Sequence, residues 1–207
     1  MLANHRLKLT APRASLEGPQ LSRHVRFTWK GKMKIIVLPI AFLCILSSPL
    51  WAQPAPPAGW RYPTEADRTG AWKDFRGAEA PFHVRGDFNG DGLDDDVCIL
   101  LATGNDEWGL FLFEAQKTGA PRVVELEVVD PKKGHGRGPA QNMGVKVAPW
   151  GDRRTACGKG YWACAEGEPE VLHLDRAGIS YFQFESAESI FWWDAKKKEY
   201  RHTWISD

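Results

Sequence analysis

Residues 86–102 of this 207-residue chain, GDFNGDGLDDDVCILLA, place a dense group of acids directly before a hydrophobic run. Residues 86–96 hold five Asp and one Asn, and VCILLA follows at once. A short continuous apolar run bounded by turn residues is typical of a strand that is buried on both faces. The segment therefore predicts a core strand whose first residues carry a strong negative charge.

The pattern from residue 81 onward predicts a mainly β fold of antiparallel sheets. The first four apolar or alternating segments are joined by turn-like stretches, which predicts a meander followed by C-terminal hairpins. The expected strands lie in FHVRGDF (82–88), DVCILLAT (96–103), WGLFLFEAQ (108–116), RVVELEVV (122–129), MGVKVAPWG (143–151), EVLHLDRAGISYFQFES (170–186) and SIFWWDAKKKEYRHTWISD (189–207). Residues 130–142, rich in Gly and Pro, are expected to form a long exposed loop.

One short helix is expected N-terminal to the strands, within PTEADRTGAWKDFR (63–76). Thr64 and Asp67 have the spacing of an N-terminal cap, and Trp72 and Phe75 share a helical face. Gly70 weakens this prediction because Gly disfavours a helix interior.

The N-terminal part of the chain has the composition of a leader. Residues 33–52 combine Lys34, a run of about a dozen apolar residues and Ala52, which predicts a secretory signal peptide. Residues 1–32 are basic without a regular apolar period, so Met33 is the expected start and 1–32 a mis-assigned extension; a long n-region or an uncleaved anchor are the alternatives. The apolar run is too short to span a bilayer, so no stable membrane span is expected after cleavage. Residues 53–59 form a Pro-rich spacer, and 60–207 are expected to form a single β-rich domain in the periplasm or outside the cell.

Cleavage after residue 52 changes the charge of the chain. The first 52 residues hold eight Lys and Arg and one acid, so the remaining 155 carry 19 basic and 25 acidic side chains, a formal net charge of −6. A protein that binds phosphate backbones needs a basic surface. Nucleic acid is therefore not an expected partner.

Three cysteines follow the predicted cleavage point. Cys157 and Cys164, in CGKGYWAC, are seven residues apart with two Gly between them, which in an oxidising compartment predicts a disulfide. A zinc site would need further ligands at metal spacing, and the sequence has none beside this pair. Cys98 lies in the apolar run and is expected to be a buried, unreactive residue.

The acidic segment follows the pattern D-x-N-x-D-G-x-x-D of a calcium loop. If Asp87 is position 1, then Asn89, Asp91, Leu93 and Asp95 stand at positions 3, 5, 7 and 9, and Gly92 at position 6. Ca²⁺ binds six to eight oxygens, which carboxylates, amides and a backbone carbonyl at position 7 supply. An Asp-rich turn without a metal is the alternative.

This loop resembles the calcium loops of the FG-GAP and VCBS repeat families, over roughly residues 84–113. The resemblance implies ligation by the side chains of Asp87, Asn89, Asp91 and Asp95 and by the Leu93 carbonyl. A β-propeller is not implied, because the chain contains one copy of the loop. An EF-hand is not implied either, because Cys98 stands where its bidentate Glu belongs. Asp94 and Asp96 are expected to be solvated or to add one ligand, and the rest of the chain resembles small secreted bacterial proteins of unknown function.

The sequence contains no GxSxG, HExxH or P-loop motif, so a binding role is expected. The expected function is a calcium-stabilised binding or interaction module, with an unknown protein or an envelope glycan as partner. Three alternatives remain open. In the first, Glu185 and Glu188 are the carboxylate pair of an envelope glycoside hydrolase beside Trp192 and Trp193. In the second, the chain is an inhibitor or immunity-type partner protein. In the third, the glycine loop around His135 holds an anion.

Overall fold

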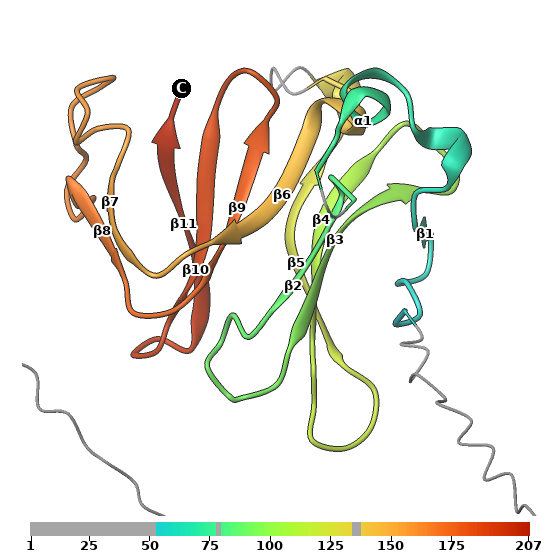
Figure 1. Ribbon diagram of the computed structural model, residues 1–207, viewed down its shortest axis with the longest axis horizontal. Coiled ribbons are helices and arrows are strands. Elements are labelled where there is room, and N and C mark those ends of the chain that lie inside the picture. The colour runs from blue at the N-terminus through green and yellow to red at the C-terminus, as the bar shows by residue number, and fades with distance from the viewer. Residues whose placement is uncertain (1–52, 78–79, 134–137) are drawn as a thin grey trace, which may run out of the picture. The chain divides into compact units, whose positions relative to one another are not determined.

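The computed structural model describes residues 53–77, 80–133 and 138–207. The predicted extension, residues 1–32, and the predicted signal peptide, residues 33–52, lie outside the described residues. Within those limits the chain is mainly β, in antiparallel sheets with one short α-helix, as the sequence predicts (Figure 1).

The first sheet contains the predicted meander. Strands β2, β3, β4 and β5 pair antiparallel in succession, and a two-residue strand β1 pairs with the end of β3. Its members are β1 (Trp60–Arg61), β2 (His83–Gly86), β3 (Asp95–Ala102), β4 (Trp108–Glu114) and β5 (Arg122–Val129). Both β1 and β2 lie along one edge of β3, while β4 occupies the other.

The second sheet has the strand order β11-β10-β9-β6 and contains the predicted C-terminal hairpin. Its members are β6 (Met143–Ala148), β9 (Gly178–Gln183), β10 (Glu188–Asp194) and β11 (Glu199–Ser206). A separate hairpin pairs β7 (Gly151–Arg154) with β8 (Val171–Leu174). Strands β1 and β7 were not predicted, because neither segment alternates over enough residues to stand out from its neighbours.

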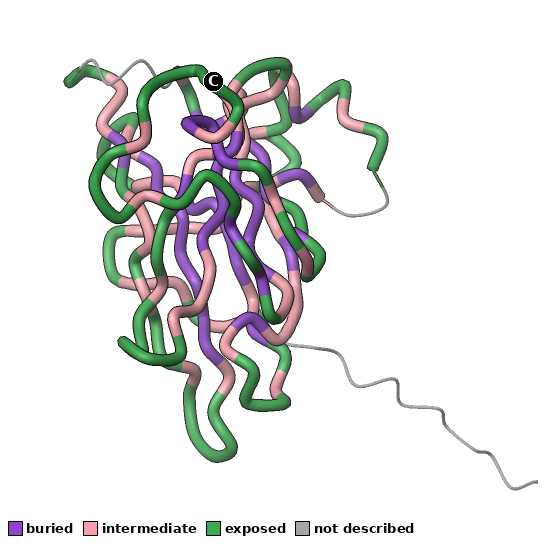
Figure 2. Tube along the Cα trace, turned by 90° about the vertical axis from the view of Figure 1, so that its left-hand side faces the viewer, coloured by how far each residue is buried: buried purple, intermediate pink, exposed green. Residues whose placement is uncertain are grey.

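The two larger sheets pack against each other through one continuous core, visible as the buried traces in Figure 2. Val97 and Ile99 of β3 lie in this core with Ile179 and Tyr181 of β9. The amide of Val145 on β6 donates a hydrogen bond of 2.9 Å to the carbonyl of Pro81, so the backbone also links the two sheets.

Both faces of β3 are buried, which explains its continuous apolar sequence. Cys98 and Leu100 point away from the main core and pack with Phe111 and Phe113, and Trp60 and Tyr62 lie against this cluster. The outer face of the second sheet is covered by the β7–β8 hairpin in the same way. Its buried cluster comprises Ala148, Leu172, Leu174, Ile190 and Ile205, with Trp192 beside them. The fold therefore has three hydrophobic layers.

The predicted helix is shorter than the sequence indicated. A 3₁₀ turn, η1 (Glu65–Asp67), precedes α1 (Gly70–Asp74), and two more 3₁₀ turns, η2 (Pro131–Lys133) and η3 (Ala140–Asn142), lie in the predicted loop. Gly70 has a φ of 53°, and Phe75 is extended, so only five residues are helical. Trp72 nevertheless anchors α1, because it is buried and its indole donates a 2.7 Å hydrogen bond to the Met143 carbonyl.

The predicted disulfide is present between Cys157 and Cys164, with sulfur atoms 2.02 Å apart. It closes the loop between β7 and β8, and the amide of Ala156 holds this loop to β11 through the Trp204 carbonyl. The loop presents Tyr161 and Trp162 at the surface. The bond therefore closes an irregular segment that lies outside the regular strands.

Loss of this disulfide is expected to destabilise the fold. In the double variant Cys157→Ala/Cys164→Ala, the free energy of unfolding should fall by about 2.5 kcal/mol, because the unfolded chain gains the entropy of an open loop. Chemical denaturation measures the difference. A thiol reductant should destabilise the wild-type chain and leave the double variant unchanged; equal stability of both proteins under oxidising conditions would contradict this expectation.

Candidate functional site

The acidic loop, defined here as residues 87–94, connects β2 to β3 and is anchored in the core. Phe88, its second residue, is fully buried between the sheets. Gly90 and Gly92 have φ values of 81° and 86°, a conformation that Gly adopts without steric cost. The calcium-loop pattern therefore coincides with a tight turn, and Gly92 stands at the position where the pattern requires Gly.

The side-chain oxygens of this loop bind its own backbone. The Asp87 carboxylate accepts three N–H bonds, from residues 90–92, at 2.6–3.2 Å. Asn89 accepts the amide of Asp91 at 2.8 Å, and Asp91 accepts the amide of Leu93 at 2.8 Å. Side chains that bond to backbone two or three residues on stabilise tight turns. The alternate positions of the pattern thus fix the shape of the loop.

A buried carboxylate lies at the base of the loop. Asp95, the first residue of β3, is 0 % exposed, and its oxygens accept the amides of Phe88 and Ala115 at 3.2 and 3.0 Å. The pKa of Asp95 is raised to about 6, mainly by burial; the two hydrogen bonds oppose this rise, and the charges of Asp91 and Glu114 add to it. Negative charge is therefore concentrated at this point.

Glu114, at the end of β4, adds a second buried carboxylate. One of its oxygens contacts the guanidinium of Arg122 at 2.5 Å, while Oε1 is buried and has no hydrogen-bond partner among the described residues. The hydroxyl of Tyr200 on β11 is also buried and has no hydrogen-bond partner among the described residues. Burial and the charges of Asp95 and Glu114 raise the pKa of Tyr200, so its phenol stays protonated. Two buried oxygens, Oε1 of Glu114 and the hydroxyl of Tyr200, therefore lack hydrogen bonds within the described residues.

The predicted calcium donors fit the metal by chemistry and are not gathered around one point. Asp87, Asn89, Asp91, Asp95 and the Leu93 carbonyl supply hard oxygen ligands of the kind that Ca²⁺ prefers. Within the described ranges, no three His, Cys, Asp or Glu side chains are grouped closely enough to hold a metal ion. Calcium binding by this loop therefore stays a prediction.

The two remaining acids of the segment have other partners. Oδ1 of Asp96 lies at hydrogen-bond distance, 2.9 Å, from Nε2 of His83 on β2. Asp94 lies 3.6 Å from Nε of Arg85 on the same strand. Both acids therefore take part in pairing along the edge of the first sheet.

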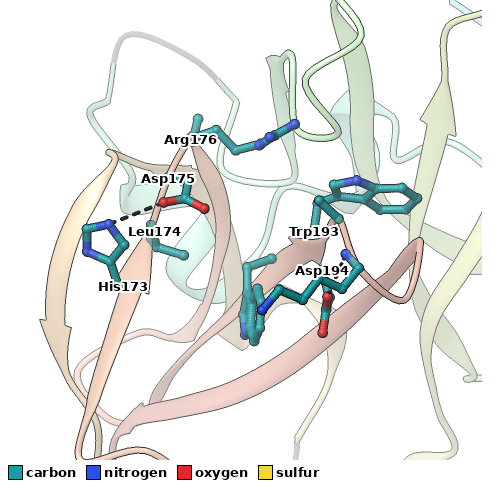
Figure 3. Close-up of a pocket in the computed structure, with 10 residues that line it drawn as sticks. His173, Leu174, Asp175, Arg176, Trp193 and Asp194 are labelled. Carbon is teal, nitrogen blue, oxygen red and sulfur yellow. Dashed lines mark hydrogen bonds and ion pairs between the residues drawn. The ribbon is translucent and has the colours of Figure 1, made fainter.

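A cavity of about 270 Å³ lies between the turn before β9 and the end of β10 (Figure 3). We call it the tryptophan cavity, because adjacent indoles, Trp192 and Trp193, contribute to its walls. The full lining comprises His173, Leu174, Asp175, Arg176, Ala177, Trp192, Trp193, Asp194, Ala195 and Lys196. Strand β10 extends here beyond its pairing with β9, which ends at Phe191 and Ile179, and this offset creates the space.

Arg176 connects the tryptophan cavity with the acidic loop. Its guanidinium donates a hydrogen bond to the carbonyl of Asn89, and Figure 3 shows the side chain extending across the cavity toward that loop. A Cβ on Gly90 would overlap the same guanidinium. Gly90 therefore permits Arg176 to approach the loop closely.

His173 lies at the rim of the cavity between two acids. Its Nδ1 is 2.5 Å from Asp152 and its Nε2 is 3.2 Å from Asp175. The hydrogen bond to Asp152, and then its charge, raise the pKa of His173, and Asp175 adds to the rise. The imidazole is therefore charged over a wider pH range than an isolated histidine.

The structure does not place Glu185 and Glu188 in one cavity. Glu185 has a φ of 61° in a turn and lines a cavity of about 550 Å³ with α1 residues and Phe184. Glu188 accepts the Ser180 hydroxyl at 2.6 Å and lies 3.4 Å from the Lys146 ammonium. Since Glu188 is absent from the described lining of that cavity, no observation favours the hydrolase alternative.

Two other predicted features have separate outcomes. Cys98 is buried, and burial raises the pKa of its thiol, as expected of an unreactive cysteine. His135, considered as part of an anion-binding loop, lies outside the described residues.

Trp192 and Trp193 were predicted only as neighbours of the Glu185–Glu188 pair, and not as walls of a cavity with residues 173–177. The walls of the tryptophan cavity come from the turn at residues 175–177 and the end of β10, and the sequence gives no indication that these two turns meet. The adjacent indoles in FWWD were the available signal, and aromatic residues at that density are typical of a core.

No protein-family model, no curated protein and no solved structure matches this chain. No helix in the described part of the chain is long and apolar enough to cross a membrane. The acidic loop and the tryptophan cavity are therefore the two features of the described residues that bear on function.

The environment of His173 gives a direct prediction. Its pKa, measured by NMR titration of the imidazole protons, should lie above the ordinary value of about 6.5, because both neighbouring carboxylates stabilise the imidazolium. Asp152→Asn should lower this pKa more than Asp175→Asn does, and Asp106→Asn, an exposed acid elsewhere, should leave it unchanged. An unshifted His173 in the wild-type chain would contradict the ion pairs at the rim.

Proposed function

We propose that this protein is a secreted or periplasmic binding module whose acidic loop is stabilised by Ca²⁺. One observation carries the proposal. Asp95, a predicted ligand, is a fully buried carboxylate at the base of a loop with the D-x-N-x-D-G-x-x-D pattern, and among the described residues its oxygens accept only two backbone amides. Buried charge is costly unless it is paired with opposite charge or coordinates a metal.

The local charge balance supports a cation as ligand. Asp87, Asp91 and Asp95 add to the charge of Glu114 in this region, whereas Arg122 contacts Glu114 and Arg176 contacts a backbone carbonyl. Carboxylates that lie close together repel one another, and a divalent cation reverses the sign of that interaction.

The ligand set follows from the loop pattern and from its resemblance to FG-GAP and VCBS calcium loops. The side chains of Asp87, Asn89, Asp91 and Asp95 and the carbonyl of Leu93 would hold the ion. Its contribution would be structural, because the loop connects the end of β2 to the first residue of β3. Extracellular calcium modules bind with dissociation constants of roughly 10⁻⁴ to 10⁻³ M, and this loop belongs to that range in our proposal.

The disulfide supports the proposed compartment. Cys157 and Cys164 are bonded, and such bonds persist in the periplasm and outside the cell but are rare in the cytosol. Together with the predicted signal peptide, this favours a partner in the cell envelope, either a protein or a glycan. The net charge of the mature chain argues against nucleic acid.

The aromatic-lined cavity beside the loop favours binding as the role of the domain. Ligand sites are concave, mostly apolar, and carry a few polar groups that orient the ligand. The tryptophan cavity has this composition, and its Arg176 also contacts the acidic loop.

Calcium is expected to raise the thermal stability of the protein. At about 10 mM free Ca²⁺ and a dissociation constant near 1 mM, the folded state gains about 1.4 kcal/mol, which corresponds to a rise in Tm of roughly 3–6 °C for a domain of this size. Thermal melts with Ca²⁺ and with a chelator measure the shift.

A pair of variants separates specific binding from general screening of charge. Asp91→Ala should abolish the calcium-dependent shift, because it removes a predicted ligand. Asp106→Ala removes an exposed acid outside the loop and should retain the shift. An identical response of both variants, or no response of the wild-type chain at millimolar Ca²⁺, would refute the calcium proposal.

A further inference from the structure

The tryptophan cavity has the size of a site for a single ring. Its volume of about 270 Å³ lies just below the range of roughly 300–1,000 Å³ that is typical of sites for drug-sized ligands. It lies between the turn before β9 and the end of β10 (Figure 3) and is partly open to solvent, so a bound ring can carry a substituent that extends outward. The cavity therefore suits one residue of a polymer.

The aromatic walls of the cavity are held in place before any ligand arrives. The indole of Trp192 donates a 3.0 Å hydrogen bond to the Thr203 hydroxyl, and the guanidinium of Arg201 lies 5.7 Å from its ring centroid. Trp193 packs against the ring of Tyr200, with centroids 5.1 Å apart. Walls that are fixed in advance lose little conformational entropy on binding.

The acids that line the cavity already have partners within the protein. One oxygen of Asp194 accepts the amides of Lys196 and Lys197 at 3.0 and 3.1 Å, and the other lies 3.7 Å from Arg201. Asp175 is paired with His173 at 3.2 Å. These carboxylates therefore contribute little uncompensated negative charge to the cavity.

The cations that line the cavity retain binding capacity. The guanidinium of Arg176 donates to the Asn89 carbonyl, which leaves most of its five N–H groups for a ligand. The ammonium of Lys196 makes no ion pair or hydrogen bond within the described part of the chain. The lining thus combines apolar indoles with positive charge, which is complementary to a ligand that has an apolar face and an anionic group.

We propose that the tryptophan cavity binds a hexuronic acid residue of an acidic polysaccharide. The C–H face of the pyranose ring packs on the indole of Trp193, and Arg176 binds the ring carboxylate in the bidentate geometry that guanidinium favours. The polar rim of His173, Asp175 and Lys196 supplies partners for the hydroxyl groups. This inference rests on the binding role proposed above and names its substrate class; no residue that lines the cavity is a proposed calcium ligand, so the site does not require the metal.

The test is a titration with methyl β-glucuronide, followed by tryptophan fluorescence and by the indole N–H signals in NMR spectra. The expected dissociation constant is about 1 mM, as befits a ligand of one ring. Methyl β-glucoside, which lacks the carboxylate, should bind about tenfold more weakly, because a charged hydrogen bond is lost. Equal affinity for the two sugars, or no saturable change with the glucuronide, overturns the proposal.

Variants distinguish the roles of the walls. Arg176→Gln should remove the tenfold preference for the glucuronide while leaving binding of the glucoside unchanged, and Trp193→Ala should weaken both sugars. Trp150→Ala, at an indole that is 75 % exposed and outside the cavity, is the matched control and should bind as the wild-type chain does. Thermal melts of each variant confirm folding, and Lys196→Gln, at an exposed side chain, provides a second test should Trp193→Ala unfold.

Two further measurements define the ligand class. Benzoate carries a ring and a carboxylate without hydroxyl groups, so binding as tight as that of the glucuronide contradicts recognition of a sugar. Titrations in chelator and in Ca²⁺ separate this inference from the calcium proposal. A calcium-dependent melt without glucuronide binding overturns the uronate site alone, whereas glucuronide binding without a calcium shift upholds it and overturns the metal proposal alone.

Discussion

The buried carboxylate of Asp95 is the constraint on which the functional end of this fold depends. Its two oxygens accept the amide of Phe88 in the acidic loop and the amide of Ala115 just after β4, so one side chain ties the loop to two strands. Removal of such a charge from water is costly, and its pKa rises accordingly to about 6. The fold tolerates this cost at the point where negative charge can attract a cation.

Around this carboxylate, the core and the loop support each other. Phe88 follows the first loop acid and is fully buried, while the strand that begins at Asp95 is apolar on both faces. The loop is therefore held by hydrophobic packing at one end and by a hydrogen-bonded charge at the other. A bound ion would add to this arrangement at the residues between these two anchors, which bond mainly to one another.

The sequence predicted those features that depend on local pattern. Alternation and apolar runs located β2 to β6 and β8 to β11, and the seven-residue spacing of Cys157 and Cys164 predicted their bond. The strands on either side of residues 175–177 do not form a hairpin, because β8 pairs with β7 and β9 pairs with β6 and β10. The sequence pattern overestimated the helix, since Gly70 and Phe75 depart from helical dihedrals at either end. It missed the tryptophan cavity, because Arg176 and Trp193 meet only through the packing of two turns. Pairing between distant turns leaves no periodic signal in a single sequence.

The contact between Arg176 and Asn89 gives the acidic loop a role beyond local stability. Arg176 lines the cavity, yet its guanidinium is held by a loop carbonyl and lies where any side chain on Gly90 would stand. The orientation of the cationic wall therefore depends on the conformation of the loop. If Ca²⁺ orders the loop, it also lowers the entropic cost of holding Arg176 ready for a carboxylate. The metal and the ligand would then favour each other's binding, and by thermodynamic reciprocity each would do so by the same factor.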